Sequence, residues 1–441
     1  MGRDNVTART DRREKTVITR NQDLLERDRP TVAVLFGIDT GDNDIERMTD
    51  ELERLLDTAG GVTAARLIQS KSTPDPRTYL GSGKVQELRQ LCETQEAELA
   101  VCNDELSPAQ IKNMENEMGG NIRVIDRSML ILDIFALHAV TGEGKLQVEL
   151  AQLKYTTPRL TGRGLEMSRQ GGGAIAARGP GETKLESDRR YIRRRIQVLE
   201  ERLEEMAKNR QVQRAKRDGS GLFRFAVAGY TNAGKSTLMN YLTDAGILAQ
   251  DKLFATLDPT TRAYTLPSGM QVLLTDTVGF IRNLPHHLIR AFASTLDEVR
   301  LADGIIVLID ASDPAYASQL EVTRTLLHDL EADSKPVLYV FNKCDLHADE
   351  IPRISDAPSC DVLYISARTG EGCDALISRM EALASDGKTI ETFRFPHGAA
   401  GQAGILYTQA TVLDVQNTDT YMEIRATVDA RVRGKLRDYL V

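Results

Sequence analysis

The stretch FRFAVAGYTNAGKSTLMNYLTDA (223–245) decides the fold of the middle of this chain. Its first seven residues form an apolar run typical of a buried strand, and GYTNAGKST (229–237) follows directly, before an expected helix. This is the Gly-x-x-x-x-Gly-Lys-Ser pattern in the strand–loop–helix context of a phosphate-binding loop, or P-loop. Gly229 and Gly234 allow the backbone to curl around a phosphate, and the helix N-terminus adds partial positive charge. Lys235 is expected to reach the terminal phosphates, and the Ser236 hydroxyl to ligate Mg²⁺.

A second motif, Asp-Thr-Val-Gly (276–279), ends the predicted strand in VLLTDTVGF. Asp276 is expected to hold Mg²⁺ through water, and the Gly279 N–H to contact the γ-phosphate. The next residue is Phe280, where Ras-like enzymes carry a glutamine that orients water. Phenylalanine cannot do this, so we expect slow unassisted hydrolysis.

Two further motifs predict recognition of guanine. Asn-Lys-Cys-Asp (342–345) ends a third apolar strand, and the Asp345 carboxylate can accept two parallel hydrogen bonds from guanine, a donor pair that adenine lacks. Lys343 is expected to cover the face of the base and Asn342 to join loops. In Ser-Ala-Arg (366–368), the Ala367 N–H can donate to the guanine carbonyl. Four motifs in this order, each after a strand, predict a GTP-specific P-loop domain with a mainly parallel sheet over residues 219–388.

A first switch segment should lie between the P-loop and Asp276, in LFATLDPTTR (253–262). One threonine there is expected to close on Mg²⁺ and the γ-phosphate. Thr256, Thr260 and Thr261 are the candidates, and their spacing does not choose among them.

The N-terminal third of the chain predicts a separate α/β domain over residues 30–142. Apolar runs at TVAVLFG (31–37), AELAVCN (97–103) and NIRVIDRS (121–128) are typical of strands, and segments of helical periodicity separate them. Strands that alternate with helices predict a largely parallel sheet. Residues 1–29 are interpreted as a flexible, solvated tail, with an RNA contact as the alternative.

Residues 143–218 predict a helical hairpin. Leu146, Leu150 and Leu153 share one helix face, and a second, longer helix carries apolar residues at the spacing of a coiled-coil seam; these are Leu185, Ile192, Ile196, Leu199, Leu203 and Met206. A Gly/Arg-rich stretch joins the two helices. Residues 154–217 hold 17 basic and 8 acidic residues, a local balance of +9, and RRYIRRRI (189–196) holds five arginines. The alternatives are a solvated helix face balanced by neighbouring glutamates, or an RNA-binding surface.

Composition limits the class of the protein. The 441 residues carry a net charge of −8, with 41% hydrophobic and 27% charged residues, as in ordinary globular proteins. The total net charge conceals the basic hairpin, because the residues outside 154–217 must carry a net charge of −17. Five scattered cysteines fit a reducing cytosol, and no run reaches the ~20 apolar residues that span a bilayer. We expect a monomeric cytoplasmic protein without membrane contact. Residues 389–441 predict strands followed by a helix, a small α+β unit that acts as a structural cap, with contact to a partner protein as the alternative.

Several stretches make the chain resemble the HflX family of ribosome-associated GTPases, relatives of the Obg group. They are LQVELAQLKY (146–155), PRLTG (158–162), GGGAIAARGPGETKLESDRR (171–190), GYTNAGKST, LFATLDPTTR and DTVGFIRNLPHHLIRAFASTLDEV (276–299). The resemblance implies that Thr256 is the Mg²⁺ ligand of the first switch. It also implies that the hairpin binds the large ribosomal subunit and its RNA near the peptidyl transferase centre, and that the subunit stimulates GTP hydrolysis. The implied roles are ribosome splitting, rescue or biogenesis.

The resemblance and the motifs together give a set of candidate site residues. Lys235, Thr256, Gly279 and Asn232 are expected to act in catalysis, and Ser236, Thr256 and Asp276 to hold Mg²⁺, the last through water. The expected nucleotide contacts are Gly229, Tyr230, Thr231, Asn232, Ala233, Gly234, Lys235, Ser236, Thr237, Phe254, Ala255, Thr256, Leu257, Asp258, Asp276, Thr277, Val278, Gly279, Asn342, Lys343, Asp345, Ser366, Ala367 and Arg368.

Three alternatives stay open at this point. Asn232 is similar to an asparagine that ligates K⁺ beside the phosphates in several GTPases, or else it only caps the loop. The P-loop could also turn over ATP in an RNA-remodelling factor, although Asp345 argues against ATP as the preferred nucleotide. A membrane GTPase is a third class, and no amphipathic or lipidation signal supports it.

Overall fold

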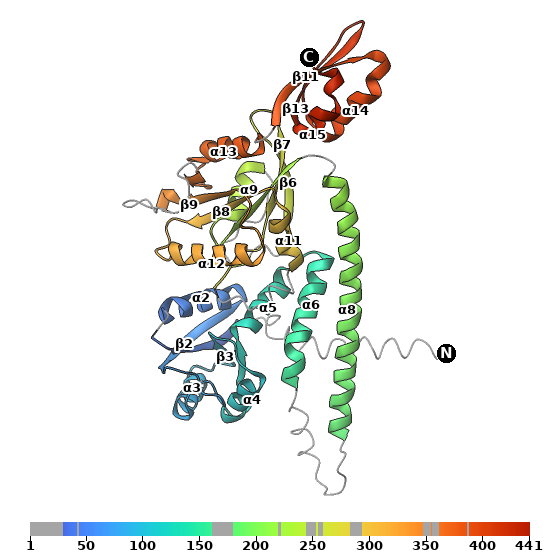
Figure 1. Cartoon of the computed structure of the whole chain (residues 1–441). Helices are drawn as coiled ribbons and strands as arrows, with labels where there is room; N and C mark the ends of the chain where they lie inside the picture. Colours follow the sequence, from blue (N-terminus) through green and yellow to red (C-terminus); the bar gives the residue numbers. More distant parts are fainter. Residues whose placement is uncertain are drawn as a thin grey trace, which may run out of the picture. The chain divides into compact units, whose positions relative to one another are not determined.

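The computed structural model describes residues 30–41, 44–160, 180–218, 222–243, 253–254, 259–282, 293–346, 354, 361–385 and 388–441 (Figure 1). Contacts divide the chain into two units, residues 1–202 and 203–441, and each is described by itself. Among the residues that the structure describes, none of the helices combines the length and the apolar character that crossing a bilayer requires.

The first unit is built on a parallel sheet with the strand order β2-β1-β3-β4. Its strands are β1 (Thr31–Asp39), β2 (Gly61–Ser70), β3 (Leu99–Cys102) and β4 (Arg123–Asp126), and its first helices are α2 (Ile45–Thr58), α3 (Ser82–Thr94) and α4 (Pro108–Glu117). The helices α3 and α4 cover one face of the sheet, and α2 lies on the other (Figure 1). The predicted α/β class with a parallel sheet is confirmed.

Local sequence signals set where these helices begin and end. Ser107 and Gln110 form a reciprocal capping box at the start of α4, with Pro108 at its first position. The Asp44 side chain accepts a hydrogen bond from the Arg47 N–H and caps α2. Such caps satisfy backbone donors that have no partner inside the helix.

Two elements of this unit were missing from the sequence prediction. The strand β2 lies at the edge of the sheet and is mostly half-exposed, so its sequence GVTAARLIQS lacks the apolar run of a central strand. The helix α5 (Arg127–His138) is buried from its first residue through Phe135. A helix whose residues are nearly all buried shows no amphipathic period, so the prediction placed Arg127 and Ser128 in the preceding strand and gave residues 129–138 no element.

The helical hairpin consists of α6 (Gly142–Thr156), the short 3₁₀ turn η1 (Thr157–Leu160) and α8 (Pro180–Asp218). In the first unit, α6 and the N-terminal part of α8 lie side by side (Figure 1). Leu153, Ile192 and Leu199 form the buried seam, and Leu146, Leu150, Tyr191 and Ile196 pack against it. Arg195 adds two hydrogen bonds to the Glu149 carboxylate, of 2.6 and 2.9 Å. Apolar contact and a bidentate ion pair therefore hold the two helices together.

The second unit contains a sheet in the order β10-β9-β8-β5-β7-β6, in which only β6 is antiparallel among the described strands. The strands are β5 (Phe223–Gly229), β6 (Thr260–Thr265), β7 (Gln271–Asp276), β8 (Gly304–Asp310), β9 (Val337–Asn342) and β10 (Val362–Tyr364). The helices α9 (Lys235–Thr243) and α13 (Cys373–Ser385) pack on one face, and α11 (Ala293–Leu301) and α12 (Tyr316–Asp329) on the other. The predicted P-loop domain with a mainly parallel sheet is confirmed.

The C-terminal part of this unit is an antiparallel sheet in the order β11-β13-β12. Its elements are β11 (Lys388–Pro396), α14 (Ala400–Gln409), β12 (Thr411–Asn417), β13 (Tyr421–Asp429) and α15 (Ala430–Lys435). The predicted order of strands followed by a helix omitted α14, which lies between β11 and β12. Ala403 and Leu406, three residues apart, are both buried against the sheet, which is the spacing of a helix face.

Packing in the hairpin predicts a contrast between two neighbouring residues of α8. Leu199 is fully buried in the seam, whereas Val198 is 40% exposed. We expect Leu199→Ala to destabilise the hairpin by about 2–5 kcal/mol, because it leaves a cavity. The matched change Val198→Ala should cost less than about 0.5 kcal/mol. Hydrogen exchange along α6 measures the difference, and equal protection in the two variants would contradict the seam.

Candidate nucleotide site

The candidate site lies at the carboxyl edge of the sheet in the second unit. The P-loop joins β5 to α9, and β5 lies between β7 and β8. The strand order therefore changes direction at the P-loop, and ligands of open parallel sheets bind at such a point. The loops after β7, β9 and β10, which carry the other three predicted motifs, follow the carboxyl ends of the same sheet.

The two P-loop glycines occupy positions that no other residue fits. Gly229 and Gly234 have φ angles of +147° and +95°. A Cβ atom would lie 2.2 Å from the Leu308 carbonyl oxygen at Gly229, and 2.3 Å from the Asn342 side-chain nitrogen at Gly234. The curl of the loop therefore depends on glycine for space as well as for conformation.

Lys235 is buried, with 7% of its surface exposed. Its ammonium group donates hydrogen bonds to the carbonyl oxygens of Gly229 and Tyr230, at 3.1 and 2.9 Å. Burial lowers the pKa of Lys235 to about 8, and the nearby Asp276 carboxylate offsets part of that effect. The charge is held under the loop, where phosphate oxygens would be bound.

Ser236 and Asp276 present adjacent hard oxygen atoms. The Ser236 hydroxyl donates to the Asp276 carboxylate at 2.9 Å, and Asp276 is fully buried. A hydroxyl and a carboxylate fit Mg²⁺, which prefers oxygen ligands and keeps several of its waters. In GTPases this ion bridges the β- and γ-phosphates and neutralises developing charge.

The P-loop is joined by backbone hydrogen bonds to Phe280, the residue that follows the Asp-Thr-Val-Gly motif. The Thr231 N–H donates to the Phe280 carbonyl at 2.8 Å, and the Phe280 N–H donates to the Gly229 carbonyl at 3.0 Å. The Tyr230 hydroxyl accepts from the Arg282 N–H at 2.8 Å. This last contact was not predicted, because nothing in the P-loop sequence indicates that the tyrosine hydroxyl would accept a hydrogen bond.

The side chains that follow Asp276 are turned into the protein. Phe280 is 1% exposed and packs in the core beneath β5 and β8. The Thr277 hydroxyl donates to the Val227 carbonyl at 2.8 Å, and Val278 is buried. Thr277 and Val278 would therefore contact a nucleotide only through their backbone. At Gly279 a Cβ atom would lie 3.1 Å from the Lys235 nitrogen, so this backbone closely approaches the P-loop lysine.

Asn342 joins the loops of the candidate base site. Its side-chain N–H donates to the Ala233 carbonyl at 2.8 Å, and its side-chain oxygen accepts from the Ala367 N–H at 2.9 Å. Lys343, with φ of +64°, donates to Asp310 at 2.7 Å. Asp310 ends β8 and was absent from the prediction, since no motif marks the end of that strand.

Asp345 and Arg368, both predicted to face guanine, contact each other. The Arg368 guanidinium lies 2.5 Å from the Asp345 carboxylate and is 73% exposed. Hydrogen bonds from Ser366, and then from Arg368, lower the pKa of Asp345. The carboxylate is therefore ionised near neutral pH, as acceptance of two guanine donors requires.

Part of the first switch prediction lies outside the described residues, namely Ala255, Thr256, Leu257 and Asp258. Phe254 is described and buried. Thr260 and Thr261, the other candidates for the Mg²⁺ ligand, belong to β6 and pair with Asp276 and Thr275 of β7.

Three family models match successive parts of the chain. They are described as GTP-binding GTPase N-terminal (residues 46–136), GTP-binding GTPase Middle Region (138–217) and 50S ribosome-binding GTPase (224–343). GTPase HflX of Lacrimispora saccharolytica is 46% identical over 92% of this chain and 95% of its own length. GTPase HflX of Escherichia coli is 39% identical over 91% of this chain and 92% of its own.

The chain belongs to the HflX family. It is therefore a GTPase, which binds GTP and hydrolyses it to GDP and phosphate. Among solved structures, a GTP-binding protein from Sulfolobus solfataricus in complex with GDP is similar, with 25% identity, a TM-score of 0.43, and coverage of 81% of this chain and 99% of its own. The HflX assignment rests on the sequence matches, since that TM-score is too low for an argument from shape.

The lowered pKa of Lys235 predicts a pH dependence of nucleotide affinity. Below about pH 8 the lysine is charged in the empty protein, and phosphate binding would keep it charged at higher pH. Binding should then take up a proton above that pH, so affinity should fall as pH rises, by at most about tenfold per unit. Titration calorimetry with GDP, in two buffers of different ionisation enthalpy, measures the uptake. Equal affinity at about pH 7 and about pH 8.5 would contradict it.

Proposed function

We propose that this GTPase is a switch whose output is nucleotide-dependent binding to the large ribosomal subunit. The observation that carries the proposal is the match of residues 224–343 to a family described as 50S ribosome-binding GTPase. It is supported by the hairpin, whose residues 154–217 carry a local charge of +9 in a chain of net charge −8. Ribosomal RNA presents a dense negative surface that favours such a local excess of arginine.

The candidate site suggests how a γ-phosphate would set the switch. The P-loop is hydrogen-bonded to residues 280–282, so a phosphate bound by one segment would also position the other. In the proposed bound state Ser236, Thr256 and Asp276 hold Mg²⁺, the last through water, and Gly279 contacts the γ-phosphate. Loss of that phosphate after hydrolysis would release the segment.

Slow intrinsic hydrolysis, stimulated by the ribosome, is part of the proposal. Phe280 occupies the position after Gly279 and its side chain is buried in the core. It cannot orient a water molecule, so the free enzyme would lack that contribution to catalysis. The ribosome would then supply order to the switch segments.

The proposed division of labour follows the predicted boundaries. The hairpin at 143–218 would bind the subunit, residues 219–388 would bind GTP, residues 389–441 would form a cap, and residues 30–142 form the N-terminal α/β domain. Splitting, rescue and biogenesis are all outcomes that a nucleotide-controlled ribosome binder could serve in the cytoplasm. The proposal treats the active form as a monomer.

Sedimentation with purified large subunits tests the switch. We expect the chain to pellet with subunits when a non-hydrolysable GTP analogue is bound, and to stay in the supernatant with GDP, because only the γ-phosphate orders the switch. Asp345→Asn provides the control, because an asparagine at this position should recognise xanthine in place of guanine. This variant should therefore pellet with subunits only when an analogue of xanthosine triphosphate is present. Equal pelleting in all nucleotide states would rule out the switch.

The second hypothesis concerns K⁺. Asn232 has φ of +62°, a left-handed conformation that asparagine tolerates, and it lies in the P-loop. If its amide oxygen ligates K⁺ beside the phosphates, hydrolysis should be faster in potassium chloride than in sodium chloride at equal ionic strength. Asn232→Gly preserves the backbone conformation and should abolish the difference. Equal rates for the unchanged chain would mean that Asn232 only shapes the loop.

A further inference from the structure

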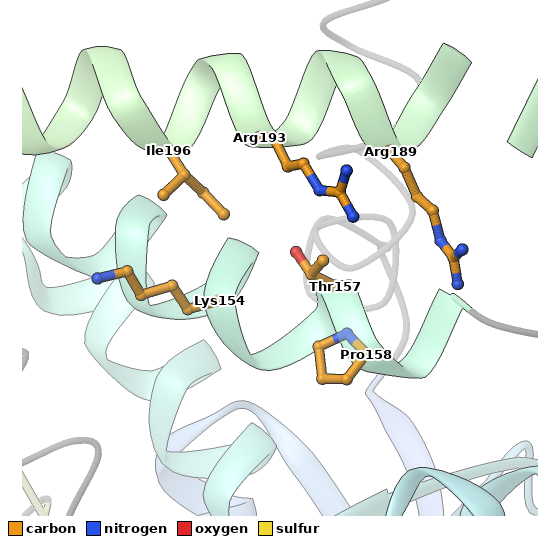
Figure 2. A pocket seen from close by; sticks show the side chains of 6 residues that line it. All are labelled: Lys154, Thr157, Pro158, Arg189, Arg193 and Ile196. Atoms are coloured by element: carbon orange, nitrogen blue, oxygen red, sulfur yellow. The ribbon is translucent and has the colours of Figure 1, made fainter. Parts of the chain in front are cut away.

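A pocket opens between the end of α6, the η1 turn and α8, all in the first unit (Figure 2). Its volume is about 490 Å³, and it is lined by Lys154, Thr157, Pro158, Arg189, Arg193 and Ile196. Pro158 and Ile196 provide apolar surface, and Arg189 and Arg193 extend from α8 toward η1 (Figure 2). Lys154 lines the pocket from α6, and its ammonium group is paired with Glu200.

The two arginines differ from Arg195 and Lys154, whose charges are paired with glutamates of the described part of the hairpin. Arg195 is engaged by Glu149, and Lys154 lies 2.6 Å from Glu200. Within the described part of the chain, neither Arg189 nor Arg193 forms an ion pair or a side-chain hydrogen bond. Two guanidinium groups one helical turn apart thus lack a counter-charge, and their forked donors match phosphate oxygens.

We propose that this pocket binds one phosphodiester of an unpaired RNA nucleotide together with its base or ribose. The proposal rests on the proposed function, since it takes ribosomal RNA as the partner of the hairpin. The cations alone would suit any phosphate. The apolar floor adds the surface on which a splayed base or sugar packs, and RNA-binding proteins recognise unpaired nucleotides by this combination.

The helix backbone and the apolar floor of the pocket are held in place by contacts within the hairpin. Ile196 also packs on the α6–α8 seam, and the bidentate contact of Arg195 with Glu149 lies two residues from Arg193. A site whose walls are fixed loses less conformational entropy on binding. The pocket also lies where η1 leads into residues 161–179, a segment with three arginines, so further basic residues adjoin it in the sequence.

The arginine run provides a matched control. Arg190 and Arg194 belong to the same two turns of α8 and are exposed, but they do not line the pocket. The double variants Arg189→Glu/Arg193→Glu and Arg190→Glu/Arg194→Glu therefore change the net charge equally. Any difference in subunit affinity between the two double variants is therefore due to the pocket and not to the overall positive charge of the hairpin.

The experiment measures affinity for purified large subunits at several salt concentrations, with the same GTP analogue throughout. The pocket variant should bind at least about tenfold more weakly than the control variant, and its salt slope should be smaller by about one. Arg193→Lys keeps the charge without the fork and should lose only part of the affinity. Thermal melts check folding, and if the glutamate variants do not fold, the corresponding glutamine pairs replace them.

Equal weakening by the two pairs would overturn the pocket and leave only a diffuse basic surface. Photo-crosslinking from p-benzoylphenylalanine at position 157 identifies the occupant: label in RNA supports the proposal, and label in ribosomal protein alone overturns it. The proposed switch is judged separately, from GTP against GDP states of the unchanged chain. The proposal for the pocket can therefore be wrong while the proposed switch is right, and the switch can be wrong while the pocket is right.

Discussion

One side chain, that of Asn342, holds the nucleotide site together. It donates to the P-loop at Ala233, 109 residues earlier in the chain, and accepts from Ala367, 25 residues later. The residue is 2% exposed, so the amide makes both bonds away from water. Loss of either would leave a buried backbone group without a partner, which costs about 1–3 kcal/mol. The P-loop, the Asn-Lys-Cys-Asp loop and the Ser-Ala-Arg loop therefore keep their spacing as a set.

The sequence marks the P-loop clearly because the geometry of that loop leaves little choice of residue. Gly229 and Gly234 have carbonyl and amide groups pressed against them, so their identity follows from the geometry. The contacts of Tyr230 with Arg282 and of Lys343 with Asp310 were not predictable in this way. Many residues could make such contacts, and only the folded chain brings their partners together.

The elements missed in the fold have a common physical cause. A helix or strand can be recognised in a sequence when one of its faces is apolar and the other polar. The helix α5 is buried from Arg127 through Phe135, and β2 is half-exposed along most of its length, so neither has two contrasting faces. The helix α14 was missed for another reason: its residues 404–409 also suit a strand, and Ala403 and Leu406 pack on the C-terminal sheet along one helix face. Tertiary contacts decided all three cases.

The Arg368–Asp345 contact bears on how the enzyme empties its site. A carboxylate in the role proposed for Asp345 would face water alone whenever no base is bound, and its desolvation during rebinding would slow capture. Here the solvent-exposed Arg368 guanidinium lies 2.5 Å from that carboxylate. Because the arginine is 73% exposed, it can swing away at little energetic cost when a base returns. With such a partner at hand, turnover of GDP for GTP would exchange one partner of the carboxylate for another and would not expose a bare charge.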